Sequence, residues 1–284
     1  MSATRVWMAS LLAMGWVAVG CAGADNVDVL TYDEFKAQAY LDPETGVFLV
    51  DGDEPVNGEA RLREVYESYL DSVTRAGDPG YGTTEQGLII NRVGDQDDKW
   101  LGDTALHLNY CVSLVGFGLN YARVVTAMRD AAAAWEDHTW TKFHHLVAED
   151  ALCSVLNSNS VVFEVRPGSF NDDTYAVAFF PSYEPRLRNI RIANRAFGNI
   201  SPITLTGLLR HELGHVLGFR HEHIRPEQPY RSCHEGSNWR ALTPYDSASV
   251  MHYPHCNGSN RGDLVLTERD RAGVAMVYPL PGGG

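Results

Sequence analysis

The chain has 284 residues, a length that fits one large domain or two small ones. Hydrophobic residues make up 44% of it and aromatic residues 10%, which suffices for a core and excludes a globally disordered protein. The formal net charge is −13 at pH 7 and the sequence has no basic stripe. We therefore expect no nucleic-acid partner, because phosphate binding needs clustered Lys and Arg.

The first twenty residues predict a signal peptide. Arg5 precedes an uncharged apolar run from Val6 to Gly20, which is short for a membrane span and typical of a secretory signal. Two processing sites are open. Ala18-Val19-Gly20-Cys21 resembles a bacterial lipobox, in which Cys21 would be acylated, whereas Ala22-Gly23-Ala24 is a cleavage site that would discard Cys21. Either site predicts export, as an outer-membrane lipoprotein of the bacterial cell envelope or as an extracellular protein, with membrane contact only through the lipid.

Residues 21–84 form an acidic segment that ends in a linker. Thr31-x-x-Glu34 is a capping-box pattern and predicts a short helix. A second helix is expected from about Gly58 onward, because apolar residues recur there at helical spacing: Leu62, Val65, Tyr66, Tyr69, Leu70 and Val73. The run from Ala76 to Thr84 is rich in turn-forming residues and predicts an exposed boundary before a larger domain over residues 85–281.

The larger domain is expected to contain strands alternating with helices. The predicted strands cover residues 105–112, 161–165, 175–180 and 190–193. Residues 120–138 carry apolar side chains at three- and four-residue steps and predict a long helix. Residues 266–278 predict a closing C-terminal helix. The pair His144 and His145 lacks ligand spacing on a helix, so we interpret both as surface or core residues.

Four cysteines remain once Cys21 is set aside, an even number that suits an oxidising compartment. Cys233 and Cys256 bracket the loop that follows His221. We therefore predict the pairs Cys233–Cys256 and Cys111–Cys153. Four free thiols are the alternative. No Cys-x-x-Cys occurs, which argues against a second zinc site.

The residues from His211 to His221 read HELGHVLGFRH and predict a zinc site. We expect a helix from about Pro202 to Leu217, preceded by Ser201 as its N-cap. On that helix His211 and His215 are four residues apart, so both imidazoles project from one face.

The third ligand and the base follow from the same motif. Gly218 suits a sharp turn after the helix, which would bring His221 back toward the other two histidines. Three protein nitrogens leave a fourth position open, which is typical of one catalytic Zn²⁺ ion and not of a structural one. Glu212 follows the first ligand and can act as general base toward water at that position. An ordinary amphipathic helix with several histidines is the alternative interpretation.

A second segment carries a family resemblance. Ser249-Val250-Met251-His252-Tyr253 follows the histidines by about thirty residues and resembles the methionine turn of the metzincin zinc endopeptidases, in particular the astacins. The resemblance implies that Met251 packs beneath the metal. It also implies that Tyr253 is a fifth zinc ligand that swings away to stabilise the oxyanion.

Other residues extend the resemblance and limit it. His221-Glu222-His223-Ile224-Arg225 matches an astacin run in which the glutamate holds the new N-terminus after activation, so Glu222 inherits that role. Pro226-Glu227-Gln228 departs from the astacin pattern. The short methionine turn and Leu266-Thr267-Glu268-Arg269-Asp270 look as much like matrixins. The implied fold is α+β: a twisted mixed sheet with a long helix and an active-site helix, then a small C-terminal subdomain.

The acidic segment also resembles a family feature, the astacin prosegment. Val50-Asp51-Gly52-Asp53 is similar to its Phe-x-Gly-Asp pattern, whose aspartate occupies the open zinc position and keeps the zymogen silent. The resemblance implies a small, mostly helical prosegment with Asp53 as a zinc ligand and Asp51 as the second candidate. An Asp-Gly hairpin turn is the competing interpretation.

These observations predict a zinc metalloendopeptidase, secreted or lipid-anchored, that is made as a latent zymogen and hydrolyses proteins or peptides. Substrate is expected to lie extended along the strand at 175–180. The alternative is a catalytically silent zinc-containing surface lipoprotein for binding or adhesion, to which Arg261-Gly262-Asp263 could contribute. Retention of Glu212 favours the enzyme, because that glutamate is dispensable for binding metal.

Overall fold

A computed structural model describes residues 29–50, 52–74, 88–153, 160–170, 174–225, 235, 238–256, 258–259 and 262–280. The predicted signal peptide, Cys21, Asp51, the linker from Ala76 to Thr84, Pro226-Glu227-Gln228, Cys233 and Arg261 lie outside these residues. Within the described residues, no helix is both long and apolar enough to cross a membrane.

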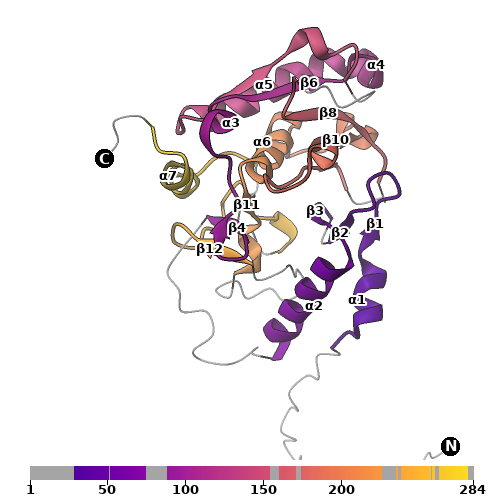
Figure 1. Ribbon diagram of the computed structural model, residues 1–284, viewed down its shortest axis with the longest axis vertical. Coiled ribbons are helices and arrows are strands. Elements are labelled where there is room, and N and C mark those ends of the chain that lie inside the picture. Colours follow the sequence, from indigo (N-terminus) through magenta and orange to yellow (C-terminus); the bar gives the residue numbers. More distant parts are fainter. Residues whose placement is uncertain are drawn as a thin grey trace, which may run out of the picture.

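Residues 29–74 fold as a small unit, here called the N-terminal unit, with two helices and a three-stranded antiparallel sheet (Figure 1). The helices are α1 (Tyr32–Gln38) and α2 (Glu59–Thr74), and the strands are β1 (Tyr40–Leu41), β2 (Phe48–Val50) and β3 (Glu54–Val56). Both helices were predicted, and the Thr31–Glu34 capping box is present. The sheet was not predicted, because its strands have only two or three residues each and leave little alternation to detect.

The rest of the chain is built on a five-stranded mixed sheet, as predicted. Its strand order is β7-β6-β8-β10-β9, with β6 (Leu108–Val112), β7 (Phe143–His145), β8 (Phe163–Gly168), β9 (Ala176–Val177) and β10 (Asn189–Ala193). The first four strands are parallel, and β9 pairs antiparallel with β10 at the edge.

Two helices beside this sheet carry the centre of the core (Figure 1). Helix α5 (Tyr121–Glu136) buries one face, as its spacing predicted, and packs against α6 (Leu205–Val216). The ring nitrogen of Trp135 donates to the Arg210 carbonyl at 2.9 Å, and the ring stacks on Phe219. Trp135 is fully buried and fixes α6 against α5.

A second, antiparallel sheet lies below α6 and joins β4 (Ile89–Val93), β5 (Gln96–Asp97), β11 (Phe219–Arg220) and β12 (Trp239–Ala241). The remaining α-helices are α3 (Gly102–Leu106), α4 (Leu114–Phe117) and α7 (Glu268–Val277). Short 3-10 helices are η1 (Gly118–Asn120), η2 (Val147–Glu149), η3 (Pro185–Leu187), η4 (Asn194–Phe197), η5 (Glu222–Ile224) and η6 (Pro254–Cys256). Helix α7 confirms the predicted C-terminal helix, and a Thr267–Asp270 capping box starts it.

Three predicted boundaries are wrong. The strand expected at 105–112 begins only at Leu108, where pairing with Phe143 starts, and α3 takes the preceding residues. The strand expected at 175–180 is reduced to β9, because only two of its residues pair with β10. The zinc-motif helix begins at Leu205 and not near Pro202, because Thr204 is the N-cap and accepts the Gly207 N–H at 3.0 Å.

The cysteine prediction is confirmed for one pair. Cys111 and Cys153 form a disulfide with a Cα–Cα distance of 5.8 Å. Cys256 is also disulfide-bonded, and Cys233, its predicted partner, lies outside the described residues.

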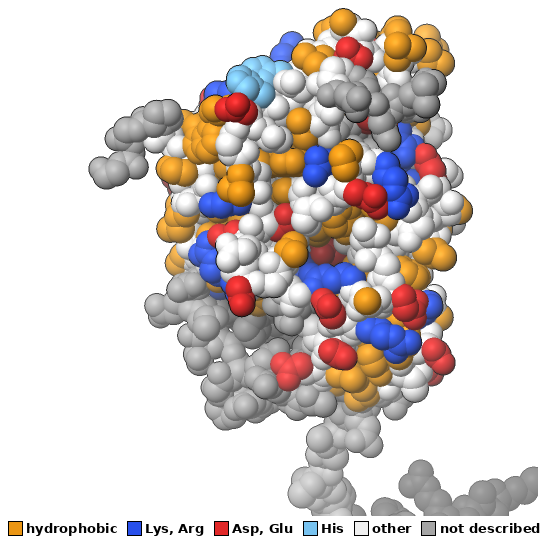
Figure 2. All heavy atoms as spheres, in the orientation of Figure 1, with side chains coloured by type: hydrophobic (Ala, Val, Ile, Leu, Met, Phe, Trp, Pro, Cys, Tyr) orange, Lys and Arg blue, Asp and Glu red, His pale blue; other side chains and the backbone are white. Residues whose placement is uncertain are grey.

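Charged side chains of both signs are interspersed on the face drawn in Figure 2. His144 and His145 lie on β7, at the edge of the five-stranded sheet. His145 contacts Asp150 at 2.9 Å and His144 contacts His107 at 3.1 Å, so both take part in local pairs.

Candidate metal centre

Helix α6 and the turn after it bring the three motif histidines together. Gly218 has φ +97°, and a Cβ there would collide with the carbonyl oxygen of Asp98, so the turn requires glycine. The chain then returns as β11 and places His221 opposite His211 and His215. The Nε2 atom of His221 lies 3.0 Å from that of His211 and 3.1 Å from that of His215.

This geometry fits a zinc ion. Two imidazole nitrogens that bind one zinc at about 2.0–2.1 Å with a tetrahedral angle lie about 3.3 Å apart. All three rings are buried. The Nδ1–H of His211 donates to the Val250 carbonyl at 2.7 Å and that of His215 to the Phe219 carbonyl at 2.8 Å, which leaves both Nε2 lone pairs facing inward.

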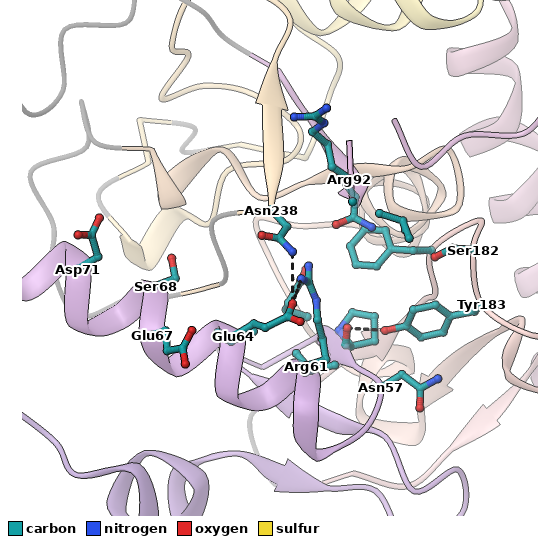
Figure 3. A pocket seen from close by; sticks show the side chains of 18 residues that line it. Asn57, Arg61, Glu64, Glu67, Ser68, Asp71, Arg92, Ser182, Tyr183 and Asn238 are labelled. Atoms are coloured by element: carbon teal, nitrogen blue, oxygen red, sulfur yellow. Dashed lines mark hydrogen bonds and ion pairs between the residues drawn. The ribbon is translucent and has the colours of Figure 1, made fainter. Parts of the chain in front are cut away.

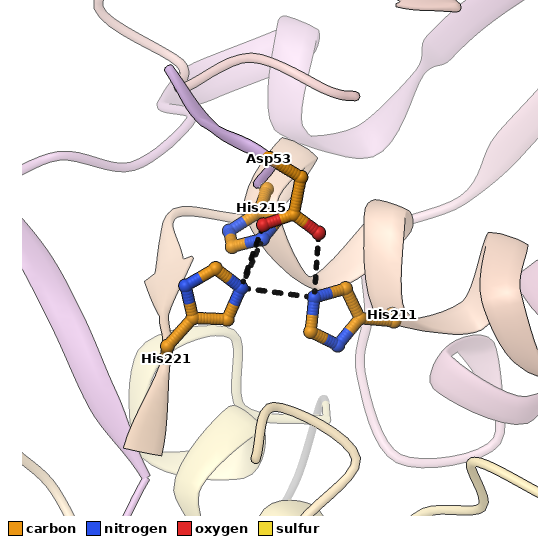
Figure 4. A group of neighbouring side chains, drawn as sticks. All are labelled: Asp53, His211, His215 and His221. Carbon is orange, nitrogen blue, oxygen red and sulfur yellow. Dashed lines mark hydrogen bonds and ion pairs between the residues drawn. The ribbon is translucent and has the colours of Figure 1, made fainter. Parts of the chain in front are cut away.

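Asp53 reaches the same point from the N-terminal unit (Figure 4). Its carboxylate oxygens lie 3.5 Å from His211 Nε2 and 3.2 Å from His221 Nε2, and with His215 they form a four-residue group that could hold a cation. Gly52, with φ +110°, forms the β2–β3 turn just before it. A hairpin turn was the competing interpretation of this segment; Gly52 lies in such a turn, and the carboxylate of Asp53 faces the histidines.

Burial and neighbouring charges shift the pKa values of Asp53 and the histidines in different directions. Burial opposes ionisation of Asp53, yet His221 and His211 hold its pKa well below the ordinary range. Burial and the two neighbouring histidines lower the pKa of His215. Burial also disfavours the charge on His221, but Glu235 and Asp53 raise its pKa well above the ordinary value. The neighbouring carboxylates therefore favour the charged form of His221, whereas burial favours the neutral form of His215.

Glu212 lies on α6 between the first two histidines and is fully buried. Neither of its carboxylate oxygens has a hydrogen-bond partner among the described residues. Burial, and next the charge of Asp53, raise its pKa well above the ordinary value. A buried carboxylate without partners is costly for stability, and residues of this kind concentrate at functional sites.

Met251 packs against α6, and Tyr253 lies beside the histidines and Asp53. A Cβ at Gly214 would collide with the Met251 sulfur, so the methionine packs directly against α6 beneath the histidines. The Tyr253 hydroxyl donates to Asp53, and its ring lies 4.2 Å from the His221 ring, centroid to centroid. Asp270 anchors this turn to α7 by accepting the Ser249 hydroxyl at 2.5 Å and the Val250 N–H at 2.9 Å.

Glu222 is buried beside the methionine turn. One oxygen accepts the Asp246 N–H at 2.9 Å and lies 3.5 Å from Arg225. Its other oxygen has no hydrogen-bond partner among the described residues.

Three functional candidates were missed by the sequence interpretation. Glu235 accepts the Nδ1–H of His221 and pairs with Arg220 at 3.1 Å. Arg220 is also 3.1 Å from Glu54 of the N-terminal unit. The acid at 235 follows no recognised motif. The sequence pointed only to Glu54, because this second carboxylate directly follows the predicted zinc ligand Asp53.

The N-terminal unit docks beside β9 through polar contacts and a small apolar cluster. Thr174 donates to the Gly52 carbonyl at 2.7 Å, and Tyr183 donates to the Pro55 carbonyl at 2.6 Å. Arg191 pairs with Asp42 at 2.5 Å. The cluster consists of Val47 and Leu49 from the unit and Val177 and Leu187 from the rest of the chain.

Two cavities flank this contact. A cavity of about 740 Å³ lies between α2 and β4, and Asn238 donates across it to Glu64 at 3.3 Å (Figure 3). A smaller one of about 170 Å³ adjoins His211 and Tyr253 and has an apolar wall that includes Ile203, Leu208 and Leu264.

Known proteins with similar sequences are astacin-like. No protein-family model matches the chain. It is 35% identical over 94 residues to the astacin-like metalloendopeptidase of Gallus gallus, which covers 27% of this chain and 20% of that protein. It is 35% identical over 88 residues to tolloid-like protein 2 of Mus musculus, covering 24% of this chain and 9% of that protein. The chain thus spans a fifth or less of the length of these relatives.

Solved structures give weaker similarities. Myroilysin aligns with a TM-score of 0.45 at 16% identity, covering 68% of this chain and 98% of that one. The hatching enzyme zinc-protease HCE-1 from Oryzias latipes aligns with a TM-score of 0.41 at 18% identity, covering 66% and 98%. The sequence relatives confirm the predicted resemblance to astacin-like metalloendopeptidases. The three histidines and Asp53 form a group that fits the zinc of such enzymes.

Proposed function

We propose that this chain is a zinc endopeptidase and that the form described is its latent state. The observation that carries the proposal is the four-residue group at the end of α6. The buried Nε2 atoms of His211 and His215 lie within 3.1 Å of His221 Nε2, a buried glutamate lies beside the three rings, and Asp53 approaches from a separate unit.

The histidines, Glu212 and Tyr253 would each have a separate role in the reaction. Zinc held by His211, His215 and His221 would supply a Lewis acid for the scissile carbonyl and the attacking water. Glu212 removes the proton from that water and passes it to the leaving amine. The Tyr253 hydroxyl donates a hydrogen bond to the developing oxyanion once it is released from Asp53.

Protein or peptide substrates would bind along β9. This strand lies at the edge of the sheet with β10 on one side, so an extended backbone can pair with its other side. The N-terminal unit borders this edge, because Val177 of β9 packs against Val47 and Leu49. Substrate and the N-terminal unit would therefore compete for one surface.

The N-terminal unit, within the predicted prosegment of residues 21–84, would maintain latency. Asp53 takes the position that water needs, and Tyr253 is engaged by the same carboxylate. Cleavage between Arg75 and Arg92 would release the unit. Glu222, whose second oxygen has no hydrogen-bond partner among the described residues, would then receive the new N-terminal ammonium.

We also propose that the protein is exported. A signal peptide at residues 1–20, lipidation at Cys21 or its removal, and a catalytic domain over residues 85–281 remain the predictions of the sequence. The Cys111–Cys153 disulfide supports an oxidising compartment.

Casein or gelatin hydrolysis tests the proposal. The full chain and a chain processed at the linker are assayed with and without a chelator, beside Glu212→Ala in both forms. We expect the processed wild type to be active, and the alanine variant to retain zinc but lose about 10²–10⁴-fold in activity. Equal activity of wild type and variant would end the enzyme proposal, and zinc binding without turnover in either would favour a silent binding lipoprotein.

A further inference from the structure

The three histidines differ in what their Nδ1–H groups contact. His211 and His215 donate to backbone carbonyls, which are neutral acceptors. His221 donates to the carboxylate of Glu235, which is an anion. An anionic acceptor strengthens the hydrogen bond and increases the electron density that the ring can offer through Nε2.

Glu235 is held between His221 and Arg220, and His223 lies 3.4 Å from the Glu235 oxygen that faces His221. Its side chain is fully buried. Oε1 accepts from His221, and Oε2 lies 3.1 Å from the Arg220 guanidinium. Because Arg220 and His221 are adjacent in the chain, one carboxylate fixes both side chains at the end of β11. A carboxylate buried this deeply needs such a pair, and Arg220 neutralises it without taking the oxygen that His221 uses.

A second cation is the competing interpretation of the same residues. His221, His223 and Glu235 form a second group whose ligand atoms lie within 4.8 Å of one another. Arg220 places a positive charge 3.1 Å from that carboxylate, which opposes a divalent ion beside it, and Glu54 shares this charge at 3.1 Å. The Glu235 oxygen of this group also accepts the Nδ1–H of His221, so a cation there would have to displace that hydrogen bond. The charges favour a hydrogen-bonded carboxylate.

We propose that Glu235 is a positioning residue that orients His221 and strengthens it as a zinc ligand, with Arg220 as its counter-charge. The inference rests on the proposed zinc site and goes beyond it, because it assigns a residue outside the motif. The hydrogen bond to Glu235 also makes His221 the strongest electron-pair donor to zinc among the three histidines. Removal of the Glu235 charge should lower zinc affinity by about 10–100-fold.

The test compares Glu235→Gln with Glu184→Gln, which removes the same charge from an exposed side chain. Zinc affinity of the full chain is measured by competition with a chromogenic chelator, and the cobalt-substituted proteins are compared by visible absorption. We expect Glu235→Gln to bind zinc 10–100-fold more weakly, with shifted cobalt bands, and Glu184→Gln to match the wild type.

Folding is followed separately by circular dichroism of the metal-free proteins. Glu235→Asp keeps the charge beside Arg220 and provides a second variant if the glutamine chain does not fold; we expect a smaller loss of zinc affinity in the same direction. Wild-type affinity in a folded Glu235 variant would overturn the inference, and so would two zinc ions per wild-type chain. A wild type that binds no zinc would instead overturn the proposed function.

Discussion

The histidines and the aspartate that meet at the candidate site come from two regions built in different ways. The histidines belong to a continuous core in which Trp135, Met251 and Leu213 are fully buried. Asp53 belongs to a unit with its own small core, formed by Phe35, Leu62 and Tyr69 among others. The two regions meet mainly through ion pairs and hydrogen bonds.

This difference bears on how latency could work. Two of the histidines are oriented by carbonyls of their own region, and the third by Glu235, also outside the N-terminal unit. Removal of the N-terminal unit should therefore leave the three Nε2 atoms in place and uncover them. Under the proposed function, the N-terminal unit would be a separable inhibitor, and the site that it covers would be preformed.

The largest effect is expected from the histidines. His211→Ala, His215→Ala or His221→Ala should each abolish stoichiometric zinc and all turnover, because two remaining nitrogens do not make a tight site. Metal content by elemental analysis checks this. His144→Ala removes a histidine outside the group and is the control. Full zinc occupancy in any of the three variants would contradict the assignment.

Tyr253→Phe separates metal binding from catalysis in the processed chain. Loss of one oxyanion donor should reduce kcat by about 10²–10³-fold while zinc content stays at one per chain. Peptide hydrolysis and elemental analysis of the same sample measure both. Unchanged turnover would remove Tyr253 from the mechanism.

Asp53→Ala tests the separation of the two regions directly. The uncleaved variant should become as active as the processed wild type, since the fourth position is then open, and the processed variant should not change. Asp33→Ala, on the exposed side of α1, is the matched control. If the uncleaved wild type is already fully active, residues 29–74 are a spacer or accessory unit.

Gly214→Ala tests how tightly the histidine region is packed. The added methyl group collides with the Met251 sulfur, so we expect a loss of about 1–3 kcal/mol in the free energy of unfolding. Chemical denaturation of the metal-free processed chain measures it. An unchanged midpoint would show that the methionine turn moves freely away from α6.

The smallest effect is expected when the pH is lowered. Burial disfavours the Asp42 carboxylate, but hydrogen bonds from Arg191 and Thr45 outweigh it and lower its pKa. Thr45 belongs to the same unit as Asp42, so only the Arg191 pair depends on docking. That pair stabilises docking above the ordinary pKa of about 3.9, and its contribution is lost as pH falls through the docked value. Hydrogen exchange of the N-terminal unit between pH 5 and 3 should show partial release, and Asp42→Asn should remove that pH step.

Local patterns were enough to predict much of the site. The four-residue step from His211 to His215, the glycine at 218 and the return to His221 are properties of one helix and one turn, so the sequence alone determined them. Helices α2 and α5 followed from apolar spacing in the same way. The start of α6 was misplaced because Ser201-Pro202 and Thr204 both suit a helix start, and the backbone contacts of the folded chain select Thr204.

Only the tertiary structure decided what surrounds the histidines. Glu235 and Glu54 meet Arg220 from positions 15 residues after it and 166 residues before it, and no local pattern joins residues so far apart. The reason is physical: a charge becomes a partner through its distance and burial, which depend on how whole elements pack. The sequence by itself determined which residues could bind zinc, and the packing decided which carboxylates orient those residues and which one covers them.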